Sequence, residues 1–409
     1  MEHVPVDFGT LGLVLLVASL VAMLTRRIGM PYSVGLVIAG FALALTPLGT
    51  NLSITPSLIM QVFLPPLVFE AALNIEWRSL RREFPLLLVL VTIGVVLAAI
   101  LVAAAMHWLT GWSWLAAGFF GVLIAATDPV SVIALFKEVR VEHRLHLLVE
   151  SESLLNDGVA AVGFALLLGI ASGSGAGAGD IGLSLVRIAI GGTLCGIVVG
   201  AFVLFLAART EDPLVEITLT MIAAYGSFLV AEQLKMSGVL ATLSAGILVG
   251  NFGKLGSLSA AGRPTLLSFW EFAAFLANSF VFLLIGDAEA SPVLLAAVPV
   301  AAVATVAALA GRAVAVYPSS LAFACTSLAV PWKYKHVLFW GGLRGALALA
   351  LALALPLSLP ERGEVIAASF LVVAFSIFVQ GLTMPVLIRR LGLLCPEGDP
   401  DCGQPADCL

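Results

Sequence analysis

Acidic residues within an apolar stretch offer the first chemistry in this sequence. The segment "VESESLLNDGVAAVGF", residues 149–164, carries Glu150, Glu152 and Asp157 at the start of a run that stays apolar as far as Ala171. Ionisable side chains are rare and costly inside membrane-spanning segments, where they mark ion or proton pathways. The alternatives for these acids are hydrogen bonding to neighbouring helices and direct participation in ion binding.

The spacing of the polar residues in this segment favours ion binding. On a helix, residues separated by one, four or five positions share one face. One polar face is therefore expected to hold Glu152, Ser153, Asn156 and Asp157. Asp157 is placed close to the middle of the membrane, Glu152 nearer the inner surface and Glu150 at the mouth of the span. Two carboxylates with a hydroxyl and an amide are more than helix packing requires.

The elements that must position these residues are membrane-spanning helices. The chain has 409 residues, of which 61% are hydrophobic and 11% are charged, against about 25% charged in ordinary soluble domains. Its mean hydropathy is +1.11. A bilayer core about 30 Å thick requires about 20 apolar residues per helix. Thirteen stretches are candidates: Phe8–Leu24, Pro31–Leu45, Ser57–Leu73, Phe84–Leu109, Trp114–Phe136, Leu145–Ala171, Ile181–Ala208, Pro213–Ala231, Gly238–Gly250, Leu266–Ile285, Pro292–Leu321, Val337–Pro356 and Val365–Leu387. They predict an all-α polytopic membrane protein with about 13 transmembrane helices.

The distribution of basic residues predicts the orientation of the chain. Cytoplasmic loops of membrane proteins carry an excess of lysine and arginine. With the N-terminus outside, fifteen of the 20 lysines and arginines fall in inner loops, three fall outside, and Arg312 and Arg344 fall within spans. The C-terminus is then cytoplasmic, and the chain is a multi-pass protein of the plasma or inner membrane. The first segment, "MEHVPVD", is acidic, unlike a signal peptide, and the net charge of −5 argues against a nucleic-acid partner.

Two domains are expected along the chain. Residues 1–390 form one transmembrane domain, and residues 391–409 form a short cytoplasmic tail that contains Cys395, Cys402 and Cys408. A zinc site made of these cysteines is the alternative, but their spacing fits no standard zinc pattern. We therefore expect a disordered tail, and we expect no cofactor.

Two apolar stretches place a charged residue where a helix is expected to break. In "IAATDPVSV", Pro129 disfavours a continuous helix because it lacks an N–H group, and Thr127 and Asp128 lie at that position. In "WGGLRGALALAL", three glycines loosen the helix around Arg344. A broken helix exposes carbonyl groups on one half and N–H groups on the other. Asp128 and Arg344 are therefore expected to compensate the half-helix dipoles.

The two breaks are seven spans apart, so their helices run in opposite directions. Paired broken helices in inverted orientation are typical of a transporter whose ion site lies at the membrane midplane. Ordinary kinks, which transmembrane helices tolerate, would explain either break alone but not a charge at both. The sequence thus predicts inverted repeats with two broken crossing helices.

Two more charged residues lie within spans. Glu70 ends "VFLPPLVFE", where a cation ligand and an interfacial cap are equally consistent with its position. Arg312, in "LAGRAVAVY", lies at a depth similar to that of Glu152. An unpaired charge inside the membrane costs several kcal/mol, so these two residues are predicted to form an ion pair. None of the five histidines falls well inside a span, which argues against a histidine proton relay.

The motifs "TDPVSV", "ESESLLNDG" and "GGLRGALALAL", in this order, resemble those of the monovalent cation/proton antiporter superfamily. The resemblance is strongest to its electroneutral branch, the microbial and animal sodium/proton exchangers, and it covers essentially the whole membrane region. In that branch an Asn-Asp pair marks electroneutral exchangers, and the pair here is Asn156-Asp157. The resemblance implies exchange of Na⁺, with Li⁺ or K⁺ as alternative cations, for H⁺ by alternating access, in the service of sodium and pH homeostasis.

The resemblance also implies roles for nine residues, carried over position by position. They are Asp157, Ser153, Glu70, Thr127 and Asn156 for cation and proton binding, Asp128 and Arg344 for compensation of the helix breaks, and Glu152 and Arg312 for a structural ion pair. Asp157 is the essential carboxylate, and Na⁺ is bound by Asp157, Ser153, Glu70 and the main-chain carbonyl of Thr127. The resemblance further implies a homodimer, a core domain that moves against a dimerisation domain, and no enzymatic activity.

Two other functions are open from the residues alone. A cation channel needs a continuous selective pore, and the sequence contains no filter-like repeat. An intramembrane enzyme needs paired aspartates or a Ser–His dyad, and no histidine lies well inside a span. Burial disfavours an ionised carboxylate, so a site that crosses the membrane interior must first be neutralised by one ion or one proton. Exchange without leak is therefore the function that the sequence favours.

Overall fold

The computed structural model of this chain is helical throughout the part that it describes. The described residues are 8–28, 30–46, 58–128, 132–133, 136, 141–172, 178–253, 258–259, 262–289 and 292–394. Within these ranges the helices are joined by turns, and the extended contacts reduce to one isolated bridge between Val141 and Leu394. The predicted all-α polytopic fold is confirmed.

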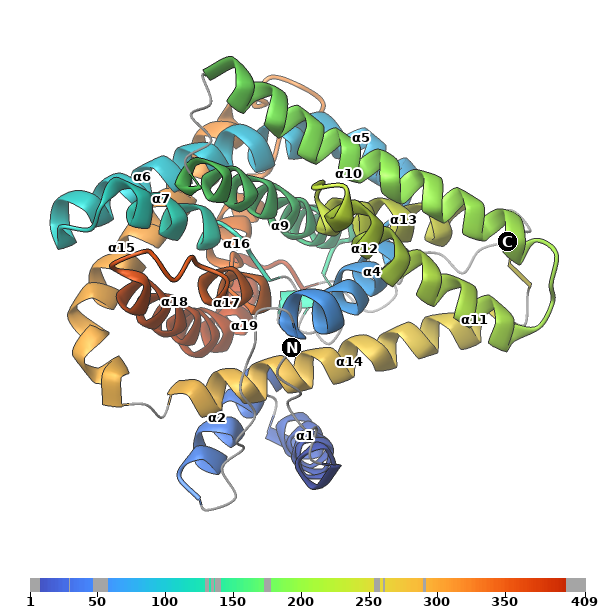
Figure 1. Cartoon of the computed structure of the whole chain (residues 1–409), viewed down its shortest axis with the longest axis horizontal. Coiled ribbons are helices and arrows are strands. Elements are labelled where there is room, and N and C mark those ends of the chain that lie inside the picture. Colours follow the sequence, from blue (N-terminus) through green and yellow to red (C-terminus); the bar gives the residue numbers. More distant parts are fainter. Residues whose placement is uncertain are drawn as a thin grey trace.

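The helices pack in two groups (Figure 1). The first helix group contains α1 (Phe8–Ile28), α2 (Tyr32–Ala44), η1 (Ile59–Phe63), α4 (Leu64–Asn74), α10 (Ala178–Ala207), α11 (Pro213–Met221), η3 (Ile222–Gly226), α12 (Ser227–Gln233), α13 (Gly238–Phe252) and α14 (Gly262–Glu289). The second helix group contains α5 (Trp77–Val89), η2 (Leu90–Gly94), α6 (Val95–Thr110), α7 (Trp114–Leu123), α9 (His143–Ala171), α15 (Pro292–Leu321), α16 (Trp332–Trp340), α17 (Ala346–Leu353), α18 (Arg362–Phe375), η5 (Ser376–Gly381) and α19 (Leu382–Leu391). Helix α9 also contacts α10, α13 and α4 of the first group. The η elements are π-helical turns inside longer helices, a feature often found at functional sites.

Seven helical segments within the described residues are long and apolar enough to cross a membrane by length and composition. They are Trp77–Thr110, His143–Ala171, Gly182–Ala207, Pro213–Gln233, Gly262–Leu283, Ala297–Leu321 and Arg362–Leu391. Four shorter apolar helices accompany them: Tyr32–Ala44, Ile59–Asn74, Trp114–Leu123 and Gly238–Phe252. The protein is therefore a multi-pass membrane protein, whereas the count of thirteen spans stays a prediction.

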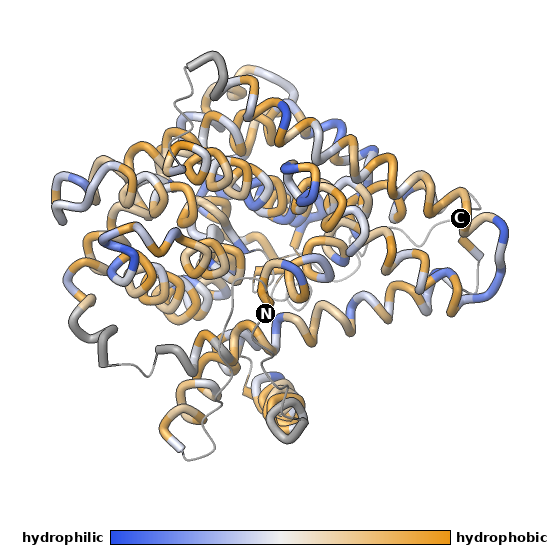
Figure 2. The backbone as a smooth tube through the Cα atoms, viewed as in Figure 1, coloured by the Kyte–Doolittle hydropathy of each residue, from blue (hydrophilic) through white to orange (hydrophobic). Residues whose placement is uncertain are grey.

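The outer surface of the molecule is apolar. Helix α10 exposes large hydrophobic side chains along its length, among them Leu183, Ile190, Leu194, Val198 and Phe202. Figure 2 shows that hydrophobic residues dominate most helices, while the hydrophilic ones gather at helix ends and toward the interior. Exposure of such a surface to water would be costly, whereas lipid tails are as apolar as these side chains and can surround them.

Glycine allows α2 and α14 to approach each other closely. A Cβ atom on Gly40 would lie 2.0 Å from the carbonyl oxygen of Leu283, and one on Gly286 would lie 2.1 Å from that of Val37. Real Cβ atoms do not approach backbone atoms so closely, so these positions tolerate only glycine without a backbone shift. Small residues at helix contacts are typical of membrane proteins.

Two of the thirteen apolar stretches do not form one continuous helix. In the stretch from Trp114, α7 ends at Leu123, residues 124–128 are not helical, and helical structure returns at residues 132–133 and 136. Pro129, at the expected break, lies outside the described residues. The stretch around Arg344 is split into α16 and α17, with residues 341–345 between them. A glycine of this second break makes room for a neighbouring side chain, because a Cβ atom on Gly342 would lie 2.5 Å from Nε of Arg312.

Polar contacts join the turn before α7 to the start of α18. Glu361 accepts hydrogen bonds from the main-chain N–H of Ser113 (3.0 Å) and from its hydroxyl (3.2 Å), and Glu364 accepts one from the indole N–H of Trp112 (2.8 Å). Ser113 is also the N-cap of α7. The Ser113 main-chain amide lowers the pKa of the half-buried Glu361 carboxyl below its usual value. The turn before α7 is thus fastened to the turn before α18.

We predict that Gly40→Ala destabilises the fold. The added methyl group would force α2 away from α14, and overpacking of this kind costs about 1–3 kcal/mol. Thermal unfolding of the detergent-solubilised protein measures the effect as a lower midpoint. Gly12→Ala is the matched control, because a Cβ there has no atom within 4 Å. Equal midpoints for the two variants would contradict the close packing of α2 on α14.

Candidate ion-binding site

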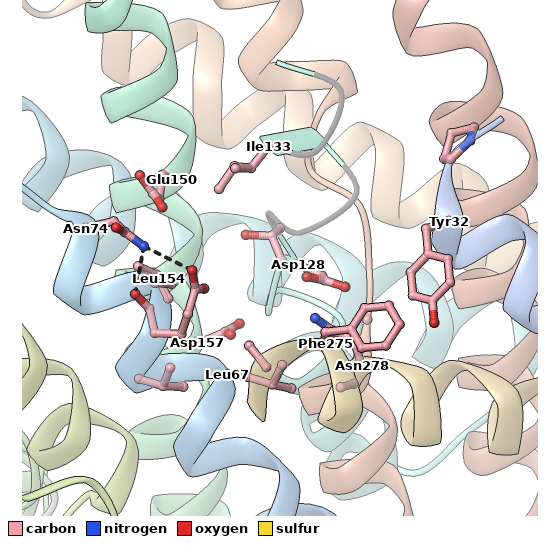
Figure 3. A pocket seen from close by; sticks show the side chains of 18 of the residues that line it. Tyr32, Leu67, Asn74, Asp128, Ile133, Glu150, Leu154, Asp157, Phe275 and Asn278 are labelled. Atoms are coloured by element: carbon pink, nitrogen blue, oxygen red, sulfur yellow. Dashed lines mark hydrogen bonds between the residues drawn. The ribbon is translucent and has the colours of Figure 1, made fainter. Parts of the chain in front are cut away.

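A cavity of about 540 Å³ lies between the two helix groups. Its walls come from α1, α2, α4 and α14 on one side, and from α9, α17 and the segment after α7 on the other (Figure 3). The acidic residues that line it are Glu70, Glu76, Asp128, Glu150, Asp157 and Glu271, and the basic residues and histidines are Arg26, His143 and His146. An excess of carboxylates gives a cleft a negative potential, which concentrates cations.

Asp157 lies near the middle of the 29-residue helix α9. Its side chain faces the cavity but is only 8% exposed, and its Oδ1 atom is buried without a hydrogen-bond partner. The main-chain amide of Thr127 hydrogen-bonds the carboxyl group. Figure 3 shows Asp157 with Asp128 and Glu150 around the same space. A proton or a cation would give this carboxylate the partner that its Oδ1 atom lacks.

The segment after α7 brings Thr127 and Asp128 to the cavity. The main-chain N–H of Asp128 donates to the carbonyl oxygen of Leu343 at 2.7 Å, so the two helix breaks touch each other. A Cβ atom on Gly345 would lie 2.4 Å from Oδ2 of Asp128, which shows how closely this carboxylate approaches the backbone there. The Asp128 carboxylate therefore lies at the N-terminal end of α17, where the helix dipole is positive.

Two buried arginines cover the C-terminal end of α16. Arg312 donates to the carbonyl oxygen of Leu338 from Nε (3.2 Å) and from Nη2 (2.7 Å). The Nη1 group of Arg344 donates to the carbonyl oxygen of Gly342, and its Nε atom is buried without a partner. Cations stabilise the negative end of a helix dipole. The break thus carries a carboxylate at its positive end and guanidinium groups at its negative end.

The polar residues of α9 point in two directions. Glu152 accepts from both Nη groups of Arg312, with 2.7 Å between Nη2 and Oε2. The Nδ2 group of Asn156 donates to Oε1 of Glu152 (2.5 Å) and to Oγ1 of Thr127 (3.2 Å). Neither Glu152 nor Asn156 is among the residues that line the cavity. Successive helical residues point about 100° apart, so Glu152 turns toward Arg312 of α15 and Asn156 toward Thr127, while Asp157 turns into the cavity.

The remaining predicted ligands lie on either side of Asp157. Glu70 lines the cavity from α4, and its Oε1 atom accepts a hydrogen bond from Nδ2 of Asn74 at 3.0 Å (Figure 3). Ser153 is buried one turn before Asp157, does not line the cavity, and has no hydrogen-bond partner for its Oγ atom. The structure therefore brings Asp157, Glu70 and Thr127 to one cavity and leaves Ser153 beside it.

The cavity carboxylates do not form a metal-binding cluster. Among the described residues, no group of three or more histidine, cysteine, aspartate or glutamate side chains is placed to hold a metal ion. The alternative zinc site at Cys395, Cys402 and Cys408 lies outside the described residues.

Uncharged polar residues also line the cavity, and the positions of ionisable groups in the sequence did not predict them. Asn278 lines the cavity from α14, and so does Tyr32 from α2. The hydroxyl groups of Tyr32 and Ser279 are hydrogen-bonded at 2.7 Å, and the rings of Tyr32 and Phe275 stack at 5.2 Å. The adjacent Asn278 and Ser279 in an otherwise apolar stretch are the signal that could have identified this wall.

Comparison with known proteins gives matches over nearly the whole chain. A sequence profile described as "Sodium/hydrogen exchanger, transmembrane" matches residues 13–390. The chain is 40% identical over 367 residues to the Na(+)/H(+) antiporter ApNhaP of Aphanothece halophytica, which covers 89% of this chain and 70% of that protein. It is 39% identical over 386 residues to the Na(+)/H(+) antiporter NhaS2 of Synechocystis sp., which covers 94% of this chain and 71% of that protein.

The fold is also similar to that of a solved structure. The sodium proton antiporter MjNhaP1 from Methanocaldococcus jannaschii, at pH 8, matches with a TM-score of 0.77 at 20% sequence identity, over 94% of this chain and 98% of that one. Fold and profile together define a multi-pass membrane transporter. The chain belongs to the sodium/hydrogen exchanger family, as the resemblance of its motifs predicted.

We predict that Arg312→Ala lowers the free energy of unfolding by about 3–5 kcal/mol, because it leaves the buried Glu152 carboxylate without its partner. Glu152→Ala should be destabilising for the reciprocal reason, and the double variant should be less destabilised than the sum of the two. Thermal or denaturant unfolding in detergent measures all three, with Arg187→Ala on the exposed face of α10 as the control. Additive effects would show that the two side chains do not interact.

Proposed function

We propose that this protein exchanges Na⁺ for H⁺ across the membrane and that Asp157 is the carboxylate that binds either ion. The observation that carries this proposal is the Asp157 side chain, which is buried at mid-helix on the wall of a cavity and has an oxygen without a partner. Relatives that are 40% and 39% identical are named Na(+)/H(+) antiporters. The family to which the chain belongs supports the same reaction.

The mechanism follows from the cost of moving a charge through a low-dielectric region. An ionised carboxylate is strongly disfavoured in apolar surroundings, so Asp157 is neutralised by one proton or one cation before the site changes its side of access. The empty, charged site does not cross, which prevents leak. Exchange of one proton for one sodium ion moves no net charge.

The predicted ligand set provides oxygen donors, which hard cations prefer. Asp157 and Glu70 supply carboxylate oxygens, Thr127 supplies its main-chain carbonyl, and Ser153 supplies a hydroxyl whose oxygen is buried without a partner. In this proposal Asn156 orients the site, since its Nδ2 group already binds Glu152 and Thr127. An uncharged residue at this position leaves Asp157 as the single titrating group of the pair, consistent with electroneutral exchange.

Access to the site is proposed to be from the cytoplasm in this conformation. Arg26, Glu76 and His143 line the cavity and lie at helix ends that the distribution of basic residues places inside. The cavity is bounded by both helix groups, so a movement of one group against the other would close it on one side. We assign the second helix group to the moving core and the first to the dimerisation domain of a homodimer.

We propose that the whole chain has its N-terminus outside and its C-terminus in the cytoplasm, with residues 1–390 as the transport domain and residues 391–409 as a separate tail. Asp128 and Arg344 compensate the broken helices, and Glu152 with Arg312 serves as a structural pair. The protein acts as a transporter without a cofactor and without enzymatic activity, with Li⁺ or K⁺ as further candidate cations.

Replacing Asp157 by Asn is expected to abolish sodium-driven proton movement, because the amide cannot exchange a proton for a cation. Proteoliposomes that contain a pH-sensitive fluorophore measure this movement after addition of NaCl, LiCl or KCl over a range of pH. Glu271→Gln removes a carboxylate from the same cavity but from an exposed position on α14, and should retain exchange. Retained exchange in Asp157→Asn would refute the assignment.

The exchange rate is expected to be independent of membrane potential. One-for-one exchange carries no net charge, so clamping the potential with potassium and valinomycin at different values should leave the initial rate unchanged. A rate that rises or falls steadily with potential would show an unequal stoichiometry, and a conductance far above carrier turnover would favour a channel.

Removal of the tail is expected to leave transport intact. A stop codon after Leu394 deletes the segment from Cys395 onward and keeps the contact between Val141 and Leu394. Exchange and thermal stability should match those of the full chain, because the cavity and both helix breaks lie before the deletion. Loss of exchange with normal stability would mean that the tail belongs to the transport unit.

A further inference from the structure

The break between α16 and α17 leaves main-chain groups without helical partners in the interior of the protein. The last carbonyl groups of one helix have no intrahelical donor, and the first N–H groups of the next have no intrahelical acceptor. Lipid cannot satisfy them at membrane depth, and each buried group without a partner is costly. The residues that supply the missing hydrogen bonds are therefore the ones that hold the break in its shape.

Groups already described satisfy part of this requirement. Arg312 binds the carbonyl oxygen of Leu338, and Arg344 binds that of Gly342. The carbonyl oxygen of Leu343 accepts from the N–H of Asp128. The main-chain N–H of Arg344 and the carbonyl of Trp340 are among the groups that these contacts leave to be satisfied from elsewhere.

Both are satisfied by side chains of the π-helical turn η5. The main-chain N–H of Arg344 donates to Oγ of Ser376 at 3.0 Å, and Nε2 of Gln380 donates to the carbonyl oxygen of Trp340 at 3.1 Å. The Ser376 hydroxyl has its own acceptor in the carbonyl oxygen of Val373 at 2.8 Å. Ser376 is 1% exposed and Gln380 is 4% exposed, so water does not compete for these bonds.

The connection from η5 to the ion site is short. Arg344 lies between Leu343 and Gly345, and both of these neighbours contact Asp128 through its main chain or side chain. Asp128 follows Thr127, which bonds to Asp157. A shift of the break at Arg344 would therefore move the groups that surround the Asp157 carboxylate.

We propose that Ser376 and Gln380 are positioning residues for cation binding: they hold the break between α16 and α17, and through it Asp128 and Thr127, in the geometry that the site requires. This inference rests on the proposed exchange of Na⁺ for H⁺. A π-helical turn suits the role, since such turns interrupt a helix locally and occur at functional sites. Ser376 and Gln380 are four residues apart and face the break from one side of the helix.

The experiment compares shape-matched substitutions in reconstituted protein. Ser376→Val removes the hydroxyl group. Ser376→Thr keeps the hydroxyl group and gives a side chain of nearly the same shape as valine. Gln380→Met removes the amide group but keeps a side chain of similar length. Ser369→Ala is the control, because Ser369 is a fully buried serine on the same helix that bonds only to the carbonyl of Val365 in its own helix. The readouts are the apparent KM for sodium, the maximal rate, the pH profile and the sodium-induced rise in melting temperature.

Ser376→Val and Gln380→Met are expected to raise the apparent KM for sodium about tenfold, the effect of one unsatisfied buried hydrogen-bonding group. They should also weaken the sodium-induced rise in melting temperature, which reports binding without transport. Ser376→Thr and Ser369→Ala should keep wild-type values of both. A structural serine would lower the melting temperature without changing the KM or the sodium-induced shift.

Unchanged sodium binding in both Ser376→Val and Gln380→Met would overturn the inference, as would the same loss in Ser369→Ala. Failure of both variants to fold while Ser376→Thr folds would also overturn it, because the role would then be structural. Failure of the proposed function is a different result: wild-type protein itself would show no sodium-driven proton movement. The two failures are thus distinguishable in one set of vesicles.

Discussion

Polar groups buried at membrane depth must find their partners within the protein, and this constraint shapes the centre of the structure. An unsatisfied main-chain group or an unpaired charge costs several kcal/mol there, because neither water nor lipid can compensate it. The chain breaks two of its apolar stretches, and each break exposes such groups. The contact between the breaks, from the N–H of Asp128 to the carbonyl of Leu343, lets each break satisfy part of the other.

Arg312 connects this compensation to helix α9. Its guanidinium group binds the carbonyl oxygen of Leu338 at the end of α16 and the Glu152 carboxylate on α9. Glu152 in turn binds Asn156, whose amide reaches Thr127 at the other break. A continuous series of hydrogen bonds therefore runs from one broken helix to the other, through residues of α9 that do not line the cavity. The charges in this series are balanced by their neighbours.

The surrounding protein leaves the Asp157 carboxylate only partly hydrogen-bonded. It lies one position after Asn156, yet it faces the cavity and keeps one oxygen without a partner. The carboxylate-lined cavity can supply that partner from solution, whereas the interior of the protein does not. The two breaks thus contact each other through hydrogen bonds, whereas one oxygen of the neighbouring Asp157 carboxylate has no partner.

Much of the fold could be predicted from the sequence, because helix formation in a membrane depends on local properties. Length and composition of the apolar stretches predict the helices, and Pro129 and the glycines around Arg344 predict where two of them break. The depth of Glu152 and Arg312 along their helices also follows from counting residues. The tertiary structure decided which side chains of α9 turn toward Arg312 and which turn into the cavity. It also decided the partners of Tyr32, Ser376 and Gln380, because they lie on helices distant in the chain. A single sequence carries no signal for such pairs of uncharged residues, since a hydrogen bond between two helices depends on their rotation and spacing.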